Sequence, residues 1–443
     1  MTLDDRLQNV AIIGAAGKMG SGIGVLIAQE MAKLKLKPEN KNKICKLTLL
    51  DISEVGLEGL RDYMHAQLTK VAEKSTVVLR KIYEDRPDLI ENADIINTFV
   101  RDSSAVCNYT TDLNLLRDAH LVFEAIVENE KTKIKLYKKL KKICSDNTLF
   151  LTNTSSIPIS YLDEEAGLGG RLIGYHFYNP PVVQRLVEII NAKSTVDELN
   201  TIGQELGRRL RKKLVPANDI SGFIGNGHFM RDGLYAMSEV ERLKGKFRHP
   251  GAIYVINRIT QDFLVRPMGI FQLIDYVGID IFQCILKVMR THLGDATLRS
   301  RLVDKMAKLN VLGGQYPDGS QKDGFLKYEK NRPVGVYDIR KKEYFILNDQ
   351  KKIDSSIGPL PEGFAPWRAL LMNPKKQDAL ARHFDNLSRM NTLGAELAIN
   401  FLRKTKEIGE KLVSDGVANS SDDVNAVLTN GFFWLYGPIN NYV

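Results

Sequence analysis

A histidine and a glutamate near the middle of the chain form the pattern with the clearest chemical potential. The segment YHFYNPP (175–181) places His176 at the end of an expected strand, before prolines that force a turn. Glu188 follows twelve residues later on the apolar run Leu186–Ile190, so two strands joined by a turn would bring the pair together. A carboxylate orients such a histidine and stabilises its imidazolium, which makes it a better base. The pair could take a proton from an alcohol, although a packed histidine and an incidental surface glutamate would show the same spacing.

A second polar cluster, NTSSIP (153–158), directly follows the apolar run Leu149–Thr152. If that run is a strand of an open α/β sheet, Ser155 and its neighbours lie at the carboxyl edge, where such sheets bind ligands. Serine and threonine clusters are equally common in ordinary loops and helix caps. The cluster is therefore a candidate for ligand contacts only in combination with other signals.

Near the amino terminus, glycines separate an expected strand from an expected helix. The apolar run Asn9–Ile13 leads into GAAGKMGSGIG (14–24), and a helical pattern follows. Such a turn lets backbone N–H groups and the helix amino terminus face a pyrophosphate. Gly14, Gly17 and Gly20 are spaced one residue more widely at the front than in the common dinucleotide fingerprint. The motif therefore indicates nucleotide binding without defining a reaction.

A carboxylate at the end of the next expected strand bears on the choice of nucleotide. The run Lys46–Leu50 delivers Asp51, which could accept hydrogen bonds from a ribose and repel a 2′-phosphate, favouring NAD over NADP. Asp51 lies 31 residues beyond Gly20, where about 20 is typical, and the charged stretch 33–43 would account for the excess as a surface insertion. Asp51 or Ser53 could instead simply cap the following helix.

The elements that must position these residues alternate in type. Strands are expected at 121–125, 149–152, 172–176 and 186–190, with a helix at 129–145 between the first two. Strands separated by helices predict a parallel, doubly wound α/β sheet of the Rossmann-like kind, extending to about residue 210.

From about residue 216 the pattern becomes helical. Helices are expected at 232–244, 257–263, 280–293 and 381–404, and 310–365 reads as an irregular segment with a short β element. The ending 421–440 echoes 256–275, which suggests a duplicated helical domain. The expected domains are a nucleotide-binding domain (1–214), a first helical domain (215–309), an irregular linker (310–370) and a second helical copy (371–443).

Composition restricts the class of protein. With 62 Lys and Arg against 53 Asp and Glu, the net charge is +9 and the pI about 9.1, which would suit nucleic acid or a small polyanionic ligand. Many of the lysines fall in 129–147, where they are expected on a solvated helix face. No apolar run approaches the roughly 18 residues of a membrane helix, so a soluble protein is expected. The amino terminus does not resemble a targeting peptide, and four widely spaced cysteines suggest neither disulfides nor a metal site, which favours the cytoplasm.

Several consecutive blocks resemble one family, the L-3-hydroxyacyl-CoA dehydrogenases. The blocks occur in the family's order, and they are LVFEAIVENEKTKIKLYKKL (121–140), NTLFLTNTSS (147–156), RLIGYHFYNPPVVQRLVEII (171–190), DISGFIGNGHFM (219–230) and MGIFQLIDYVGID (268–280). The resemblance implies a Rossmann-like NAD-binding domain followed by an all-α, 6-phosphogluconate-dehydrogenase-like domain in two copies. The second copy would leave either a monomer or a homodimer.

The resemblance also implies a role for individual residues. His176 would be the general base and Glu188 its orienting partner, while Ser155 and Asn226 would donate hydrogen bonds around the substrate oxygen at C3. Besides the three glycines of the turn, the implied contacts with NAD are Asp51, Glu128, Lys133, Ser155 and the active-site asparagine Asn179. Lys74 would contact the phosphates of CoA.

Three positions depart from the family pattern. Gln67 replaces the serine that accompanies Lys74 in relatives, and Gly227 stands where they usually carry an arginine. Ser320 occupies the place of a lysine, with Lys322 displaced by two residues. The change at Gln67 concerns a contact with CoA and the change at Ser320 a contact with the cofactor, whereas His176 and Glu188 are unchanged.

The expected activity is therefore NAD-dependent, reversible oxidation of an (S)-3-hydroxyacyl-CoA to the 3-oxoacyl-CoA, without a metal, a membrane or nucleic acid. One alternative keeps the chemistry but takes a 3-hydroxy acid without CoA, such as the sugar acid gulonate. Another is a catalytically silent NAD-binding or structural protein.

Overall fold

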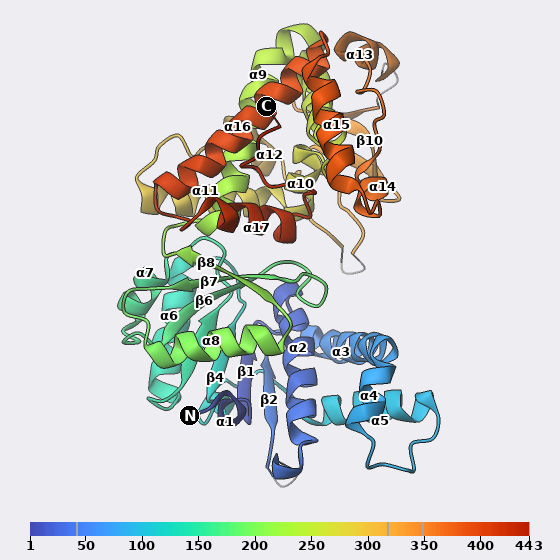
Figure 1. Cartoon of the computed structure of the whole chain (residues 1–443). Coiled ribbons are helices and arrows are strands. Elements are labelled where there is room, and N and C mark those ends of the chain that lie inside the picture. Colours follow the sequence, from blue (N-terminus) through green and yellow to red (C-terminus); the bar gives the residue numbers. More distant parts are fainter. Residues whose placement is uncertain (41–42, 317–318, 347–349, 443) are drawn as a thin grey trace. The chain divides into compact units, whose positions relative to one another are not determined.

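A computed structural model describes the chain except residues 41–42, 317–318, 347–349 and 443. It contains two compact units, Met1–Asp219 and Ile220–Val443, which are described separately (Figure 1). Residues 41 and 42 of the expected surface insertion lie outside the described residues. The second unit contains all of the segments expected as linker and second helical copy.

The first unit is built on one eight-stranded sheet in the order β3-β2-β1-β4-β5-β6-β7-β8. The strands are β1 (Asn9–Ile13), β2 (Lys46–Leu50), β3 (Cys107–Thr110), β4 (Leu121–Glu124), β5 (Leu149–Thr152), β6 (Leu172–Phe177), β7 (Leu186–Asn191) and β8 (Lys213–Asn218). The Rossmann-like sheet is confirmed, but it is mixed, because β6 and β7 pair antiparallel. Only a short loop joins these two strands, and a parallel return would need a crossover of a dozen residues or more. Strands β3 and β8 were not expected, because neither is a continuous apolar run.

Helices connect the other strands of the first unit. They are α1 (Leu3–Arg6), α2 (Lys18–Lys35), η1 (Pro38–Asn40), α3 (Glu54–Lys74), α4 (Thr76–Ile82), α5 (Asn92–Ala105), η2 (Leu113–Leu116), α6 (Glu130–Ile143), α7 (Ile159–Ala166) and α8 (Asp197–Arg209). Helix α6 shows why the sequence folds this way: Asn129 caps its first turn, Tyr137 and Leu140 are buried, and most of its lysines are exposed. Its one buried lysine, Lys133, belongs to the site described below.

The second unit is mainly helical. Its elements are α9 (Phe223–Arg258), η3 (Ile259–Phe263), α10 (Ile270–Val277), α11 (Ile279–Leu293), α12 (Arg301–Lys308), β9 (Leu326–Glu329), β10 (Arg332–Asp338), β11 (Glu343–Ile346), α13 (Gln350–Ile357), α14 (Trp367–Leu371), α15 (Lys376–Ser388), α16 (Leu393–Ser414) and α17 (Ser421–Gly431). Strands β9, β10 and β11 form a three-stranded antiparallel sheet within 310–365, the segment for which a short β element was expected. Helix α9 is kinked at Arg248, where φ is 58° and ψ is 170°, just before Pro250.

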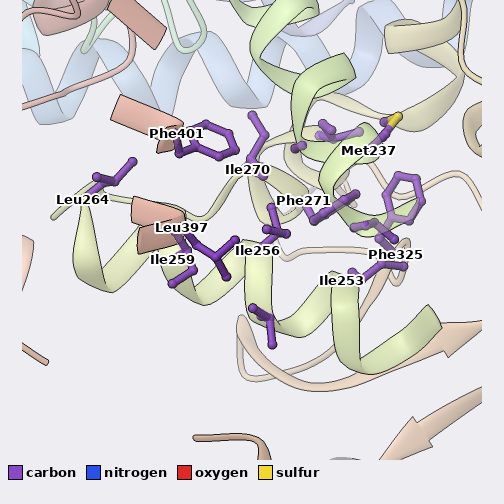
Figure 2. Packing of buried hydrophobic residues seen from close by; sticks show 14 of the residues in the cluster. Met237, Ile253, Ile256, Ile259, Leu264, Ile270, Phe271, Phe325, Leu397 and Phe401 are labelled. Carbon is purple, nitrogen blue, oxygen red and sulfur yellow. The ribbon is translucent and has the colours of Figure 1, made fainter. Parts of the chain in front are cut away.

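The core of the second unit joins segments that are far apart in sequence. Figure 2 shows Ile256 and Ile259 packed with Ile270 and, from helix α16, Leu397 and Phe401. A buried polar network lies beside this core. Arg266 contacts Asp232 at 2.8 Å and Thr405 at 3.0 Å, and its guanidinium lies 3.8 Å from the centre of the Trp434 ring. The first and last helical segments therefore stabilise each other within one unit.

No helix in the described part of the chain is long and apolar enough to cross a membrane. All four cysteines have free thiols.

Candidate active site

The hairpin formed by β6 and β7 brings the histidine and the glutamate together. His176 and Glu188 are directly opposite each other in the antiparallel register, and His176 Nδ1 lies 2.9 Å from Glu188 Oε2. Glu188 is fully buried and His176 is 7% exposed. An ionised carboxylate only accepts hydrogen bonds, so the contact places the proton on Nδ1 and leaves Nε2 as the basic nitrogen. This arrangement is suited to general base catalysis.

Tyr178 is a third member of this group that the sequence analysis did not assign. Its hydroxyl donates to Glu188 Oε2 at 2.8 Å, and its ring centre lies 4.8 Å from that of His176. Burial and the adjacent Glu188 carboxylate raise the pKa of Tyr178 well above its ordinary value, so the phenol stays protonated. Tyr178 therefore helps to fix the carboxylate that orients His176. Its place in YHFYNPP, two residues after the histidine and on the same side of an extended chain, was the available signal.

The 153–158 loop is held beside the hairpin by Asn153 and continues into helix α7. Asn153 Oδ1 accepts a hydrogen bond from the backbone N–H of Phe177 at 2.8 Å, next to His176. At the other end of the loop, the Asp219 carboxylate accepts from the N–H groups of Ile159 and Ser160 at 2.5 and 2.8 Å. Asp219 thus serves as the side-chain cap that Pro158 cannot supply.

Glu128 accepts most of the hydrogen bonds that fix this loop. Its Oε1 accepts hydrogen bonds from the Thr154 hydroxyl (2.7 Å), from the Ser155 N–H and hydroxyl (2.9 and 3.2 Å) and from the Ser156 N–H and hydroxyl (both 2.9 Å). Burial alone would raise the pKa of Glu128, but Lys133 and these donors outweigh it and hold the pKa below its ordinary value. The charged carboxylate therefore orients the loop that carries Ser155.

Lys133 is buried and held between two carboxylates. Its side chain is 1% exposed, and its Nζ lies 2.6 Å from Glu124 Oε1 and 3.6 Å from Glu128 Oε2. Burial disfavours the ammonium, yet the two carboxylates raise the pKa of Lys133 above its ordinary value. Glu124, at the end of β4, also accepts from the Thr152 and Tyr137 hydroxyls at 2.7 and 3.1 Å. The sequence analysis missed Glu124, which looked like part of an apolar strand.

The glycine turn has the form that a pyrophosphate requires. Gly14 has φ of 79°, and an added Cβ there would lie 2.6 Å from the carbonyl oxygen of Ala125. An added Cβ at Gly20 would overlap the carbonyl of Gly14. Gly17 is the N-cap of α2 and has no side chain to cap it, and the first N–H groups of a helix have no acceptor within the helix.

Asp51 and Ser53 have separate roles. Ser53 is the N-cap of α3 and accepts from the N–H of Gly56 at 3.0 Å. Asp51 accepts from the N–H of Ala16 at 3.0 Å, so this carboxylate supports the glycine turn from the end of the neighbouring strand β2. The helix terminus without a side-chain cap, the crowded glycines and the carboxylate together fit a bound dinucleotide such as NAD.

The structure gives the remaining candidate residues the following positions. Asn179 follows β6 in the loop before the prolines, and Asn226 is half-buried in the first turn of α9, in the second unit. Lys74 ends helix α3 and lines a cleft of about 610 Å³ within the first unit. The roles expected for these three residues stay predictions.

The structure shows the surroundings of two positions that depart from the family pattern, Gly227 and Lys322. At Gly227 an added Cβ would lie 3.0 Å from Leu412 of helix α16, so α16 occupies the space that a longer side chain would need. Arg231, one turn later, donates to the carbonyl oxygen of Gly227 at 2.8 Å. The Lys322 ammonium lies 5.1 Å from the centre of the Tyr316 ring.

A Rossmann-like sheet with a glycine turn, an acidic residue after the second strand and a His–Glu pair defines an NAD-binding oxidoreductase. Comparison with known proteins identifies the family. Residues 9–220 match the NAD-binding domain of 3-hydroxyacyl-CoA dehydrogenase, and residues 251–328 match the C-terminal domain of the same family. The chain belongs to the 3-hydroxyacyl-CoA dehydrogenase family and is an NAD-dependent oxidoreductase.

Individual relatives agree with this assignment. A probable 3-hydroxybutyryl-CoA dehydrogenase of Deinococcus radiodurans is 35% identical over 222 residues, which cover 50% of this chain and 76% of the relative. The human mitochondrial hydroxyacyl-coenzyme A dehydrogenase is 29% identical over 325 residues, covering 73% of this chain and 92% of the relative. The crystal structure of an Escherichia coli 3-hydroxybutyryl-CoA dehydrogenase shares the fold over 98% of this chain and 90% of its own, with a TM-score of 0.64 and 22% identity.

Proposed function

We propose that the protein oxidises an (S)-3-hydroxyacyl-CoA to the 3-oxoacyl-CoA and catalyses the reverse reduction. The observation that carries the proposal is the buried His176–Glu188 pair on a sheet whose glycine turn fits NAD. NAD supplies the hydride acceptor when it is bound. The reaction is one that fatty acid β-oxidation requires, and relatives of the chain include a glyoxysomal fatty acid beta-oxidation multifunctional protein of Cucumis sativus.

The His176–Glu188 pair would handle the proton. His176 Nε2 would remove it from the C3 hydroxyl, and the Glu188 carboxylate would stabilise the imidazolium that forms. Tyr178, which donates to the same carboxylate oxygen, would keep Glu188 oriented through the reaction. In the reverse direction the imidazolium would return the proton to the oxygen at C3.

Ser155 and Asn226 would hold the substrate oxygen, as the family resemblance implies. Ser155 is fixed by Glu128 through both its N–H and its hydroxyl, so its position is set before a ligand arrives. Preorganised donors near a developing carbonyl oxygen stabilise its charge without reorganisation during the reaction.

The cleft that contains Lys74 supports CoA rather than a free hydroxy acid. Besides Lys74, its basic lining residues are Lys33, Arg185, Arg209, Arg211 and Lys212, against the single acidic residue Glu30. Burial lowers the pKa of Lys212 to about 8, and its ammonium is held by the carbonyl oxygens of Pro181 and Gln184. A cleft with this charge suits the phosphates of CoA.

The first experiment follows NADH oxidation by the purified chain with acetoacetyl-CoA, acetoacetyl-pantetheine and free acetoacetate, with NADPH as the cofactor control. We expect turnover of the thioesters with NADH and at least a 100-fold loss of kcat in His176→Gln, because a general base contributes at least that factor. NADH binding by His176→Gln should be unchanged. Turnover of a free 3-hydroxy acid alone would favour the gulonate-like alternative, and NADH binding without any turnover would favour a silent protein.

Charge reversal tests the CoA cleft in the same assay. Lys74→Glu should raise KM for acetoacetyl-CoA by about tenfold, equivalent to about 1.4 kcal/mol, and leave KM for acetoacetyl-pantetheine unchanged. Lys70→Glu is the matched control, since Lys70 is exposed one turn earlier on α3 and does not line the cleft. Equal effects of the two variants would count against this placement of CoA.

We also propose that the second unit contains two copies of one helical motif, related by 168 residues. Val265 and Phe433 both have positive φ, of 49° and 57°. A glycine follows four residues after each of them. Gly269 lies against Asn257 and Gly437 lies against Asn425, and in both cases an added Cβ would overlap the asparagine side chain. The Oδ1 atom of Asn257 accepts from the N–H of Gln272 and that of Asn425 from the N–H of Ile439, each at 3.0 Å, with the donors 15 and 14 residues after their asparagines.

A second copy in the same chain would cover the face of α9 that a partner subunit could otherwise use. Thr405 of helix α16 and Trp434 after α17 already contact Asp232 and Arg266. We therefore propose a monomer, for which sedimentation equilibrium should give a mass near 49.9 kDa. A mass of twice that value would contradict it.

A further inference from the structure

A second strongly basic cleft lies within the second unit, away from the residues discussed above. It has a volume of about 540 Å³ and is bounded by the middle of α9, the start of α12 and the residues that follow β10. Glu241 of its lining is 15 residues beyond Asn226 on α9, which corresponds to roughly 20 Å along a helix. The volume is in the range of small-molecule sites.

The charges around the cleft are strongly unbalanced. Its basic lining residues are Lys244, His249, Arg299, Arg301, Lys305 and Arg340, and its single acidic lining residue is Glu241. Lys244 pairs with Glu241 at 2.6 Å, and Arg299 pairs with Asp304 at 2.9 Å. For Arg301, Lys305 and Arg340, the described part of the chain offers no carboxylate within ion-pair distance. These three cations therefore line the cleft without an ion-pair partner, although Glu241 acts on Lys305 at longer range. The Asp338 carboxylate also lies beside the cleft, where it accepts from the backbone N–H of Arg340.

A histidine and a helix amino terminus also line the cleft. His249 Nδ1 is buried and has no hydrogen-bond partner among the described residues, while Nε2 of the same ring lies 3.8 Å from Glu241. Helix α12 begins in the cleft, where Ser300 caps only the N–H of Val303 at 3.3 Å. The first N–H groups of a helix have no acceptor within it, so those of Arg301 and Leu302 add to the positive potential.

The floor of the cleft is apolar. Met237 and Leu302 are buried, Leu234 and Ile339 are half-buried, and all four line the cavity. A cationic rim above an apolar floor suits an anion that also has an organic part. The organic part would cover the apolar floor and exclude water from it, and the anionic part would neutralise the charges of the rim. An inorganic ion would use only the rim.

We propose that this cleft is a binding site for a small organic polyphosphate of the nucleoside triphosphate kind. Arg301, Lys305, Arg340 and the α12 amino terminus would hold the phosphates, and Leu234 and Met237 would contact the organic part. The site is separate from the proposed dehydrogenase activity, since none of its lining residues is among those proposed to bind the cofactor or the substrate.

Isothermal titration calorimetry of the full chain with ATP tests the proposal, with saturating NAD present to occupy the dinucleotide site. We expect one ATP per chain, and at least tenfold weaker binding by the double variant Arg301→Glu/Arg340→Glu. The matched control is Lys287→Glu/Lys308→Glu, which has the same change in charge at exposed positions outside the cleft and should bind within twofold of the wild type. If charge reversal impairs folding, the milder pair Arg301→Gln/Arg340→Gln replaces it. This pair should weaken ATP binding about threefold to fivefold.

Ligand controls separate the parts of the site. Tripolyphosphate should bind more weakly than ATP, and adenosine should not bind. ATP should slow amide hydrogen exchange at 299–305, where the start of α12 lies. The proposal would be overturned if the cleft and control variants bound ATP equally well, or if adenosine bound as tightly as ATP. If tripolyphosphate bound as tightly as ATP, the proposed contacts with the organic part of the ligand would be wrong. Loss of dehydrogenase activity would affect none of these measurements.

Discussion

At the scale of single residues, Glu128 receives hydrogen bonds from three consecutive residues of the loop that carries Ser155. One buried carboxylate thereby positions two backbone N–H groups and three hydroxyls. The neighbouring Lys133 supplies the counter-charge and is itself held by Glu124. Loss of the charge on Glu128 should therefore disturb Ser155 even though Glu128 is separate from the His176–Glu188 pair.

This charge should make stability depend on pH. Because the pKa of Glu128 is lower in the folded chain than in the unfolded one, its contribution is fully present above about pH 4.3 and is lost as pH falls through the folded pKa. Glu128→Gln should lower the free energy of unfolding at pH 7 by about 1–3 kcal/mol, since the donors keep only a neutral amide oxygen as acceptor and Lys133 loses one of its two carboxylate partners. Urea unfolding at pH 7, 4.5 and 3 should show the gap between wild type and variant closing toward acid. A gap that stays constant would mean that Glu128 is not charged in the folded protein.

At the scale of elements, β6 and β7 matter most, because their antiparallel register sets His176 opposite Glu188. A one-residue shift would turn one of the two side chains to the other face of the sheet. The loop between the strands is held in part by Lys212, which donates to the carbonyl oxygens of Pro181 and Gln184. The catalytic geometry is thus a property of the hairpin as a whole.

The two asparagine–glycine contacts of the second unit give a prediction at the same scale. Gly269→Ala and Gly437→Ala should each destabilise the protein by about 1–3 kcal/mol, because the added methyl group would overlap Asn257 or Asn425. Gly245→Ala is the control, since its Cβ would meet nothing within 4 Å on helix α9, and it should be stabilising by about 0.5–1 kcal/mol. Thermal unfolding compares the three variants. Similar, large losses at Gly269 and Gly437 would support equivalent roles, whereas a neutral Gly437→Ala would contradict the proposed repeat.

At the scale of the whole molecule, the second unit depends on contacts between its first and last helices. Arg266, Asp232 and Thr405 form a buried network over which Trp434 is stacked. Both tryptophans of the chain, Trp367 and Trp434, belong to this unit, so their fluorescence reports on it directly. NADH binding, in contrast, reports on the first unit.

Removal of the buried Arg266 guanidinium should strongly destabilise the second unit. Arg266→Met leaves Asp232 charged and unpaired in the core, which should lower the free energy of unfolding by about 3–5 kcal/mol. Arg389→Met, which breaks an exposed pair with Asp385, should cost less than about 1 kcal/mol. Guanidinium titrations followed by tryptophan fluorescence measure both changes. If the two variants shift the midpoint equally, the network contributes no more than a surface ion pair.

Much of the fold could be predicted from local patterns. Apolar runs identified most of the Rossmann-like strands, glycines marked the turn before α2, and the family blocks supplied the reaction class. The same patterns missed β3 and β8, which are edge or partly exposed strands without a continuous apolar run. They also missed the antiparallel pairing of β6 with β7, because strand direction depends on the connection and not on the strand itself.

By itself the sequence determined the alternation of strands and helices and the nucleotide turn, and it placed Glu188 where a turn between two strands could bring it to His176, since these depend on residue type and short spacing. Only the tertiary structure decided that Ser53 caps α3 while Asp51 supports the glycine turn, and that Lys133 is buried between Glu124 and Glu128. It also decided that α16 fills the space beside Gly227. The physical reason is that a side chain's charge, burial and hydrogen bonds are set by the neighbours that folding brings to it, and those neighbours lie far away in the sequence.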